Sequence, residues 1–335
     1  MAQSINNTNC LNTIRLLAAI QILYMHTSAH LKITMPFEIV DNIINFFDGV
    51  PIFFTLSGFL IWHSIGRSNT FGQYLKKRFW RIYPELWMAV AIELLVLVTL
   101  YKGTIDWLQF GIFGITQATI FQFWTPDCLR GYGCGCPNGS LWTICVLIQF
   151  YFFAYFIYKM LHKRKSGIWI ASIATAMAIS YFSPHIFSHL PEIAGKLYQQ
   201  TLVPYLWMFL LSAFVAEKVD YALPLLKKYW YVLLAATIII NVTGFDIKAS
   251  YFIGRTITLF LGLLGASYIF PRLNIQTDIS YGIYIYHMTI VNALIALNYS
   301  GNIWLLPIVL ALTCILAWVS TKTIGNYSQK LKKSI

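Results

Sequence analysis

The sequence predicts an all-α, polytopic integral membrane protein with about ten transmembrane helices and both termini in the cytoplasm. Of the 335 residues, 58% are hydrophobic and 11% are charged, and the mean hydropathy is +0.63. Soluble domains carry about 25% charged residues. The apolar runs approach the ~20 residues that cross a hydrocarbon core, and the 11 Trp and 21 Tyr suit interfacial belts. We expect one transmembrane domain over residues 1–335.

The expected spans follow the apolar runs in order, and short loops join them except for an outer stretch at 102–139. Runs such as Leu86–Leu100 and Ile303–Val319 are clear examples. Pro84 suits the first turn of the third span, where its missing N–H removes no helical hydrogen bond. The ten spans are residues 12–31, 43–65, 84–101, 140–161, 167–183, 201–217, 229–243, 251–270, 281–298 and 303–321.

The basic residues set the orientation. The net charge of +12 is compatible with nucleic-acid binding, but the Lys and Arg side chains lie between apolar runs and not on an amphipathic surface. We therefore expect membrane lipids as neighbours and no nucleic acid. Basic residues concentrate in cytoplasmic loops. Of the 24 Lys and Arg, 17 lie in five segments that we place inside: 67–81, 159–165, 218–228, Arg272 and the tail from Lys322.

Residues 105–124 need separate treatment. They are long enough to span, but they contain five Gln and Thr side chains. Counting them as a crossing would invert every later loop and place Lys163 outside. Non-helical backbone is tolerated at membrane depth where protein shelters it, so we predict a re-entrant or partly buried segment.

The cysteines leave one question open and argue against a metal. Cys128, Cys134 and Cys136 share the outer stretch, where they form either one disulfide or three free thiols. No Cys-x-x-Cys pair is present, so we expect no metal site.

Ionisable side chains within a span are energetically costly and are therefore functional candidates. Arg15 and His26 lie eleven residues apart in the first span. That separation is a rotation of about 1100°, which leaves the two side chains within about 20° of one face, and a rise of roughly 16 Å. The alternative is structural: Arg15 reaches the headgroups and His26 bonds a neighbouring helix. His287 is a second histidine in an apolar span.

A basic run precedes the third span. Arg78 and Arg81 are three residues apart on one face, interleaved with Trp80 and Tyr83. Such an arginine pair forks onto phosphates while an aromatic ring stacks on a base. The alternative is the ordinary topology signal of a cytoplasmic loop. In the second span, Ser57 belongs to a small-residue pair that favours close helix packing.

Two further motifs open later spans, Asn138–Thr143 around Trp142 and Ser280–His287 with Tyr281. Taken together, the motifs resemble the acyltransferase 3 family of membrane-bound O-acyltransferases, which modify bacterial surface glycans. The resemblance covers nearly the whole chain. It includes Arg15 with His26, Gly49–Leu60, Arg78-x-x-Arg81 followed by Ile82-Tyr83-Pro84, Ser140–Thr143 with Gln149–Tyr151, and Ser280-Tyr281 with His287.

The resemblance implies an O-acyltransferase of the bacterial cytoplasmic (inner) membrane. Its donor would be acetyl-CoA or a similar acyl-CoA, and its acceptor a hydroxyl of a surface glycan or lipid-linked sugar. His26 and Arg15 would be catalytic, with His26 as general base. The nucleotide would be held by Arg78, Arg81 and Tyr83. Supporting or substrate-facing residues would be Ser57, Trp142, Tyr281 and His287.

One departure and two alternatives qualify this expectation. The family usually carries a Glu five residues after Trp142, where this chain has Leu147, so another group must replace it or the mechanism differs. Direct transfer and an acyl-enzyme relay both remain open. From another class, a transporter or flippase for a glycan or glycolipid would share the helices and the basic inner face. The absence of an internal repeat counts against it.

Overall fold

The structure is a computed structural model of the chain and describes residues 9–36, 38–270 and 277–333. Arg272, one of the residues expected on the inner side, lies outside the described residues. Within them the backbone is helical and contains no strand, only an isolated bridge between Lys248 and Phe252. The all-α prediction is therefore confirmed.

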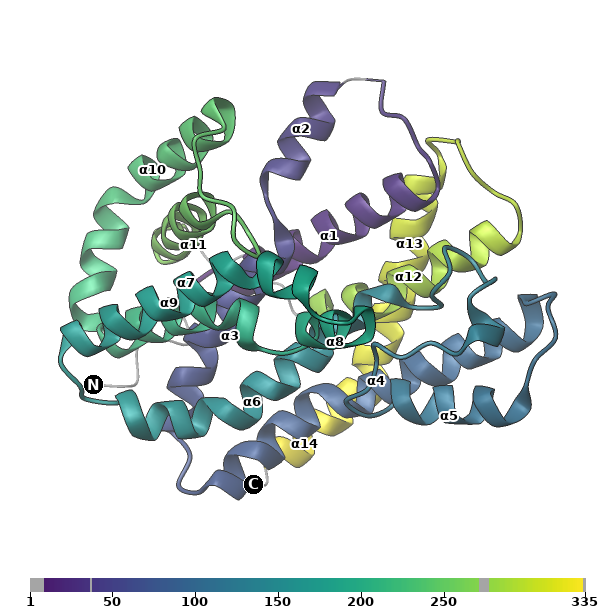
Figure 1. The fold of residues 1–335 in the computed structure, drawn as a ribbon, viewed down its shortest axis with the longest axis horizontal. Helices are drawn as coiled ribbons and strands as arrows, with labels where there is room; N and C mark the ends of the chain where they lie inside the picture. The colour runs from purple at the N-terminus through teal and green to yellow at the C-terminus, as the bar shows by residue number, and fades with distance from the viewer. Residues whose placement is uncertain (1–8, 37, 271–276, 334–335) are drawn as a thin grey trace. The chain divides into compact units, whose positions relative to one another are not determined.

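The helices follow one another along the chain, and the longest connection is residues 118–141, between α5 and α6 (Figure 1). They are α1 (Leu11–His30), α2 (Glu38–Phe46), α3 (Gly49–Gly66), α4 (Phe71–Leu100), α5 (Trp107–Gln117), α6 (Trp142–Leu161), α7 (Ser166–His189), α8 (Glu192–Gln199), α9 (Leu206–Glu217), α10 (Val219–Thr243), α11 (Ile253–Ser267), α12 (Ser280–Ala296), α13 (Leu305–Ser320) and α14 (Asn326–Lys333). Shorter turns are the 3₁₀ helices η1 (Asp127–Leu129), η2 (Gly139–Leu141) and η3 (Val203–Tyr205), and the π-helix η4 (Thr321–Gly325).

Several helices have the length and apolarity needed to cross a membrane. Within the described chain six segments qualify, or up to seven if α8 and η3–α9, bent by 44° at their junction, count as one span. The six are 38–66, 71–100, 139–161, 166–189, 219–243 and 305–328. These segments support a multi-pass membrane protein, while the count of ten and the orientation of the termini stay predictions.

Three predicted spans are helices that do not meet this measure, for physical reasons. The span 251–270 corresponds to α11, which has only 15 residues. The span 281–298 corresponds to α12, which has 17 residues, and the span 12–31 corresponds to α1; polar side chains lower the hydropathy of both helices. Those side chains include His26 on α1 and His287 and Asn292 on α12.

The segment 105–124 forms a short helix and a turn. Helix α5 has 11 residues, about 16 Å at 1.5 Å per residue, which is half of a hydrocarbon core. Asp106 caps it by accepting hydrogen bonds from the N–H groups of Leu108 and Gln109 at 3.0 and 3.1 Å. Phe113 then packs into a cluster with Leu97 and Leu129. A helix of this length agrees with the expectation that the segment does not cross.

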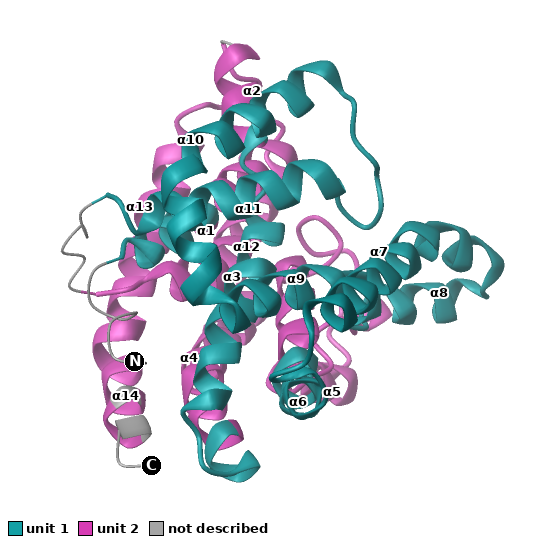
Figure 2. Ribbon diagram, turned by 90° about the vertical axis from the view of Figure 1, so that its left-hand side faces the viewer, with its two compact units in different colours: residues 1–18, 46–74, 149–275 teal, residues 19–45, 75–148, 276–335 magenta. Residues whose placement is uncertain are grey.

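The chain divides into two compact units, each built from separate stretches of sequence (Figure 2). Unit 1 comprises residues 1–18, 46–74 and 149–275, and unit 2 comprises residues 19–45, 75–148 and 276–335. Helices α1, α2, α4 and α6 contribute residues to both units. The prediction of a single domain stays a prediction.

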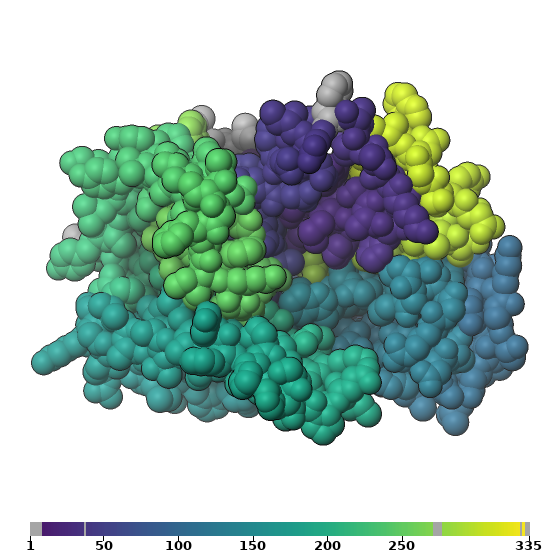
Figure 3. Space-filling model, turned by 45° about the horizontal axis from the view of Figure 1, so that its top comes forward, coloured from purple at the N-terminus to yellow at the C-terminus, as the bar shows by residue number. Residues whose placement is uncertain are grey.

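In unit 1, α10 packs along α11, and α3 packs along α9. The paired helices α10 and α11 form a continuous green surface in Figure 3. Helix α10 is apolar, yet only 6% of its most apolar 18-residue stretch is buried in the structure. Water disfavours such a surface and lipid covers it. At the second contact, a Cβ on Gly58 would collide with Ser212 Oγ and Phe209 O, which confirms close packing of small residues.

In unit 2, α12 is the central element. All but one of its residues from Ser280 to Asn292 are buried. Gly282 allows α13 to approach, because a Cβ at that position would lie 2.6 Å from the Ala317 Cβ. The polar side chains of α12 are therefore enclosed by protein.

Candidate active site

Two intramembrane histidines predicted from the sequence meet in unit 2. His26 on α1 and His287 on α12 place Nδ1 and Nε2 2.8 Å apart, with ring centroids 5.1 Å apart. His287 is fully buried, while His26 is half-buried. One turn further along α1, the ring of His30 lies 5.9 Å from that of His26. The structure thus places His26, His30 and His287 in one cluster.

Hydrogen-bond roles fix the protons in this pair. His287 Nδ1 lies 3.2 Å from the carbonyl oxygen of Ile283. A carbonyl oxygen only accepts, so Nδ1 of His287 carries the proton, and in the neutral ring its Nε2 accepts. The 2.8 Å contact then requires His26 to donate from Nδ1. Neutral His26 consequently keeps an unprotonated Nε2, which is the state that a general base needs.

The loop that contains Cys134 and Cys136 is fastened to α12 beside this cluster. Asn292 accepts a hydrogen bond from the N–H of Cys134 at 2.8 Å, and its amide donates to the carbonyls of Cys136 and Pro137 at 3.0 and 2.7 Å. The thiol of Cys134 lies 3.7 Å from the carbonyl oxygen of Cys136 and donates to it. Burial acts to raise the pKa of the Cys134 thiol, but the interaction with His30 and with backbone N–H groups outweighs it, and the pKa is lowered.

The two motifs that open α6 and α12 bind each other. Asn138 donates to the carbonyl of Ile285 at 2.9 Å, and Ser140 donates to Asn138 Oδ1 at 2.7 Å. The Tyr284 hydroxyl donates to the Ser140 carbonyl at 2.6 Å, and Thr143 Oγ1 lies 2.5 Å from the same hydroxyl. These contacts hold the start of α6 against α12, one turn before His287.

A charged pair fixes the start of α12. Arg81 Nη2 lies 3.4 Å from Asp278 Oδ2. The other oxygen of Asp278 accepts from the N–H and hydroxyl of Ser280 at 3.1 and 2.6 Å. Tyr281 donates to the carbonyl of Ile82 at 3.2 Å. The predicted arginine motif on α4 and the predicted Ser-Tyr motif on α12 are therefore in direct contact.

The nine predicted site residues divide between the units. Seven belong to unit 2, whereas Arg15 and Ser57 belong to unit 1. Arg15 shares α1 with His26, as predicted, and is half-buried. Ser57 is half-buried on α3, beside the close contact at Gly58.

The remaining predicted residues lie on α4 and α6. Arg78 is half-buried on α4. The ring of Tyr83 stacks on Phe79, with centroids 4.8 Å apart and an interplanar angle of 28°. Tyr83 therefore already has an aromatic neighbour on its own helix. Trp142 is half-buried and begins α6.

Glu93 is the most unusual acidic residue of unit 2. It is 2% exposed, and neither carboxylate oxygen has a hydrogen-bond partner among the described residues. Burial, reinforced by the charge of Glu93, raises the pKa of the nearby Tyr132 to about 12. Arg255, on α11 of unit 1, is by contrast paired with Asp48 at 3.8 Å. Leu147 occupies the position where the family usually carries Glu.

The structure bears on the cysteines and on metal binding. Cys128, Cys134 and Cys136 are free thiols, so of the two alternatives the structure shows the unpaired one. Among the described residues, no group of three or more His, Cys, Asp or Glu side chains could hold a metal ion.

Comparison with known proteins identifies the family. The family model of acyltransferase 3, which describes an acyltransferase domain, matches residues 8–322. The chain belongs to the acyltransferase 3 family. The resemblance found in the motifs is thereby confirmed over nearly the whole chain, and it includes the α1 and α12 histidines described above.

Two relatives are consistent with this membership. The acyltransferase 3 chain is 27% identical to nodulation protein 10 of Rhizobium leguminosarum bv. viciae, over 99% of this chain and 96% of the relative. It is 32% identical to an O-acetyl transferase of Shigella phage Sf6, over 42% of each chain. No solved structure matches the chain. Membership and the second relative support an O-acyltransferase.

Three residues that hold this candidate site together were not predicted from the sequence. Asn292, Asp278 and Tyr284 each connect α12 to another part of unit 2. Asn292 carried a usable signal, since an amide in an apolar helix needs internal partners. The sequence signal for Asp278 was weak: it is an acidic residue two positions before the start of a helix.

Proposed function

We propose that this protein transfers an acetyl group from cytoplasmic acetyl-CoA to a hydroxyl of a surface or lipid-linked polysaccharide. The inner membrane of a bacterium is the proposed location. The observation that carries the proposal is the His26–His287 pair, which leaves Nε2 of His26 as a free base. Family membership and the O-acetyl transferase relative support the reaction class.

In the proposed reaction, His26 Nε2 takes the proton of the acceptor hydroxyl while its oxygen attacks the thioester carbonyl. The carbon–sulfur bond then breaks. The CoA sulfur leaves as a thiolate and takes the proton back from His26, so proton and charge balance at the end. His287 holds the imidazole in the required tautomer and stabilises the imidazolium through its Nε2 lone pair. This makes His287 a positioning residue.

The donor nucleotide is proposed to bind near the start of α4 and α12. Arg78 and Arg81 would contact its phosphates through charge-assisted hydrogen bonds, and Tyr83 lies two residues after Arg81 on the same helix. Asp278 holds Arg81 at the start of α12. From Ser280 to His287, α12 rises about 10 Å toward the histidine pair. An extended pantetheine arm running beside α12 would bring the thioester to His26.

Arg15 is proposed to act with His26 from the same helix. It lies about three turns earlier on α1 and on nearly the same face. A guanidinium there suits an anionic part of the donor. Ser57 and Trp142 remain proposed substrate-facing residues.

The decisive test replaces the base. His26→Ala should abolish acetylation of surface polysaccharide, measured by mass spectrometry of polysaccharide from cells that carry each variant. His185→Ala, an exposed histidine on α7, is the matched control and should acetylate as the wild type does. Equal membrane levels of both proteins must be shown. Acetylation retained by His26→Ala would refute the mechanism.

A second readout separates the enzyme from a transporter. Purified protein given acetyl-CoA and acceptor should release the free thiol of CoA, and a glycan or glycolipid transporter would release none. The thiol is measured with a chromogenic reagent. Absence of release with a competent acceptor would refute acyl transfer.

A further inference from the structure

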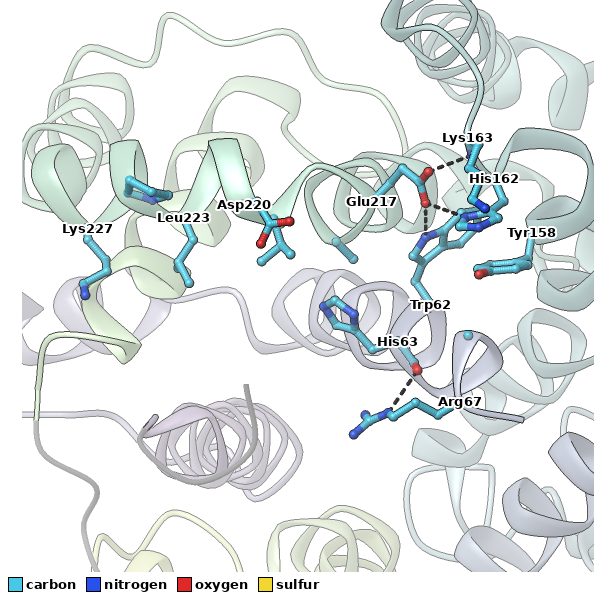
Figure 4. A pocket seen from close by; sticks show the side chains of 14 residues that line it. Trp62, His63, Arg67, Tyr158, His162, Lys163, Glu217, Asp220, Leu223 and Lys227 are labelled. Carbon is cyan, nitrogen blue, oxygen red and sulfur yellow. Dashed lines mark hydrogen bonds and ion pairs between the residues drawn. The ribbon is translucent and has the colours of Figure 1, made fainter. Parts of the chain in front are cut away.

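A second possible binding site lies in unit 1, apart from every residue assigned to acyl transfer. A cavity of about 940 Å³ is lined by residues from the ends of α3, α6 and α9 and from the first half of α10 (Figure 4). Small-molecule sites typically enclose about 300–1,000 Å³. The cavity is therefore large enough for a ligand, and none of its lining residues has a role in the proposed reaction.

Three cationic side chains surround this cavity. Arg67 follows α3, Lys163 lies in the turn after α6, and Lys227 lies on α10. All three are exposed. Arg67 donates from Nε to the carbonyl of His63 at 3.1 Å. Within the described part of the chain, its Nη groups and the Nζ groups of both lysines make no hydrogen bond or ion pair, so they are available to a ligand.

The main acidic residue of the wall is already hydrogen-bonded within the protein. Glu217 accepts hydrogen bonds from Trp62 Nε1 at 2.9 Å, His162 Nδ1 at 2.9 Å and the N–H of Lys163 at 2.7 Å. Figure 4 shows these donors converging on its carboxylate. The carboxylate of Glu217 therefore faces these donors in the wall of the cavity. Asp220 is the one other acid among the lining residues. Cationic character prevails at the opening.

The wall is also preformed. The ring of Tyr158 lies 4.6 Å from Trp62 and stacks on His162, with centroids 4.5 Å apart and an interplanar angle of 14°. Trp62 also packs edge-on against Trp169. Side chains locked by stacking and hydrogen bonds lose little entropy when a ligand binds.

The sequence position of the cations indicates the kind of ligand. Arg67, Lys163 and Lys227 all lie in segments that the charge distribution places on the inner side of the membrane. Basic pockets between transmembrane helices on that side bind phosphate headgroups. Arg and Lys recognise phosphate through charge-assisted hydrogen bonds.

We propose that the unit 1 cavity binds a phosphate ester whose phosphate lies among Arg67, Lys163 and Lys227. The ester is presented by an anionic lipid headgroup or by a soluble nucleotide, since both offer the same chemistry to these three cations. This site is separate from the proposed donor site at Arg78 and Arg81.

The test measures thermal stabilisation of the purified full-length protein. In one arm, detergent micelles contain phosphatidylglycerol, with phosphatidylcholine as the reference lipid. In the other arm, ADP is titrated in solution. Arg67→Gln and Lys227→Gln should each weaken the apparent affinity about five-fold, and the double variant about thirty-fold. Lys228→Gln removes an equal charge from the next residue, whose Nζ lies over Tyr229, and should change nothing.

Each outcome decides the matter. Stabilisation by phosphatidylglycerol that depends on Arg67 and Lys227 identifies a lipid source, and the same dependence with ADP identifies a soluble one. No stabilisation by either probe overturns the proposal. So does equal weakening by Lys228→Gln, which would show a diffuse basic surface, or ADP binding lost only in Arg78→Ala. Unchanged CoA release by the pocket variants confirms that they are folded.

Discussion

His26 and His287 are separated by 261 residues, yet their ring nitrogens lie 2.8 Å apart in unit 2. Because His287 Nδ1 faces the carbonyl of Ile283, this one hydrogen bond determines which nitrogen of His26 is protonated. The pair therefore has a direction: His287 accepts and His26 is left with a basic Nε2. The contact between α1 and α12 therefore also determines which nitrogen of His26 carries the proton.

Replacing His287 tests that direction. His287→Leu removes the acceptor, so neutral His26 is free to protonate either nitrogen, and we expect kcat to fall about 10²-fold or more. His287→Gln offers a carbonyl oxygen near the former Nε2 and should retain much more activity. The measurement is steady-state CoA release, with kcat and KM for acetyl-CoA determined separately.

A positioning role has a kinetic signature. The KM for acetyl-CoA should change little in either variant, because His287 acts through His26 and not on the donor. The pH dependence of kcat should shift in His287→Leu and return toward wild type in His287→Gln. If the Leu variant matched the Gln variant in both kcat and pH profile, His287 would be only a packing residue.

The pair of Arg81 and Asp278 gives a prediction on stability. Asp278→Ala removes both the cap on Ser280 and the ion pair, and we expect the free energy of unfolding to fall by about 1–2 kcal/mol. Asp278→Asn keeps an oxygen for Ser280 and should lose about 1 kcal/mol or less, because the ion pair is partly exposed. Thermal unfolding in detergent measures both. Equal losses would mean that the cap contributes nothing.

We expect the free thiols of Cys134 and Cys136 to react at rates that depend on pH. The pKa of Cys134 is lowered by His30 and backbone N–H groups despite burial, whereas burial raises the pKa of Cys136. Because the thiolate reacts, Cys134 should be alkylated before Cys136, and its reaction should begin at lower pH. Peptide mass mapping after timed alkylation gives both rates.

The histidine provides the control for this reactivity. His30→Ala removes the partner that lowers the pKa of Cys134, so its alkylation should slow and move to higher pH. The rate at Cys136 should stay unchanged. A Cys134 rate that is independent of His30 would contradict the assigned cause.

The sequence was sufficient for the helical class and for the residues that do not suit lipid, because both follow from composition and spacing. The rotation between Arg15 and His26 follows from helix geometry alone. What could not be predicted is which helices face one another. The contacts of His26 with His287 and of Arg81 with Asp278 join distant segments, and periodicity identifies a face without naming its partner.

The number of spans shows the same limit. A hydropathy test selects helices whose side chains are apolar enough to face lipid. Helix α12 is instead buried almost throughout by protein and carries His287 and Asn292. Its side chains are therefore less apolar than those expected of a lipid-facing span. Glu93 illustrates the converse: its place in an apolar run can be read from the sequence, but its lack of a hydrogen-bond partner among the described residues cannot.

Glu93 provides the last prediction. A buried carboxylate with no hydrogen-bond partner among the described residues lowers stability by roughly 1–3 kcal/mol. Glu93→Met fills the same volume without polar atoms and should raise the free energy of unfolding by about that amount. Proteins retain such groups mainly where function needs them, so we expect CoA release to fall in Glu93→Met although the protein is more stable.

Glu85, on the same helix, is the matched control. It is 7% exposed and accepts a hydrogen bond from Thr321 Oγ1 at 3.3 Å, so Glu85→Met should lower stability. Opposite signs of the two stability changes, measured by thermal unfolding in one detergent, would follow from the difference in partners. A Glu93→Met variant that is less stable than wild type would show that the carboxylate has a stabilising partner. One that is more stable and fully active would show that the reaction does not need the Glu93 carboxylate.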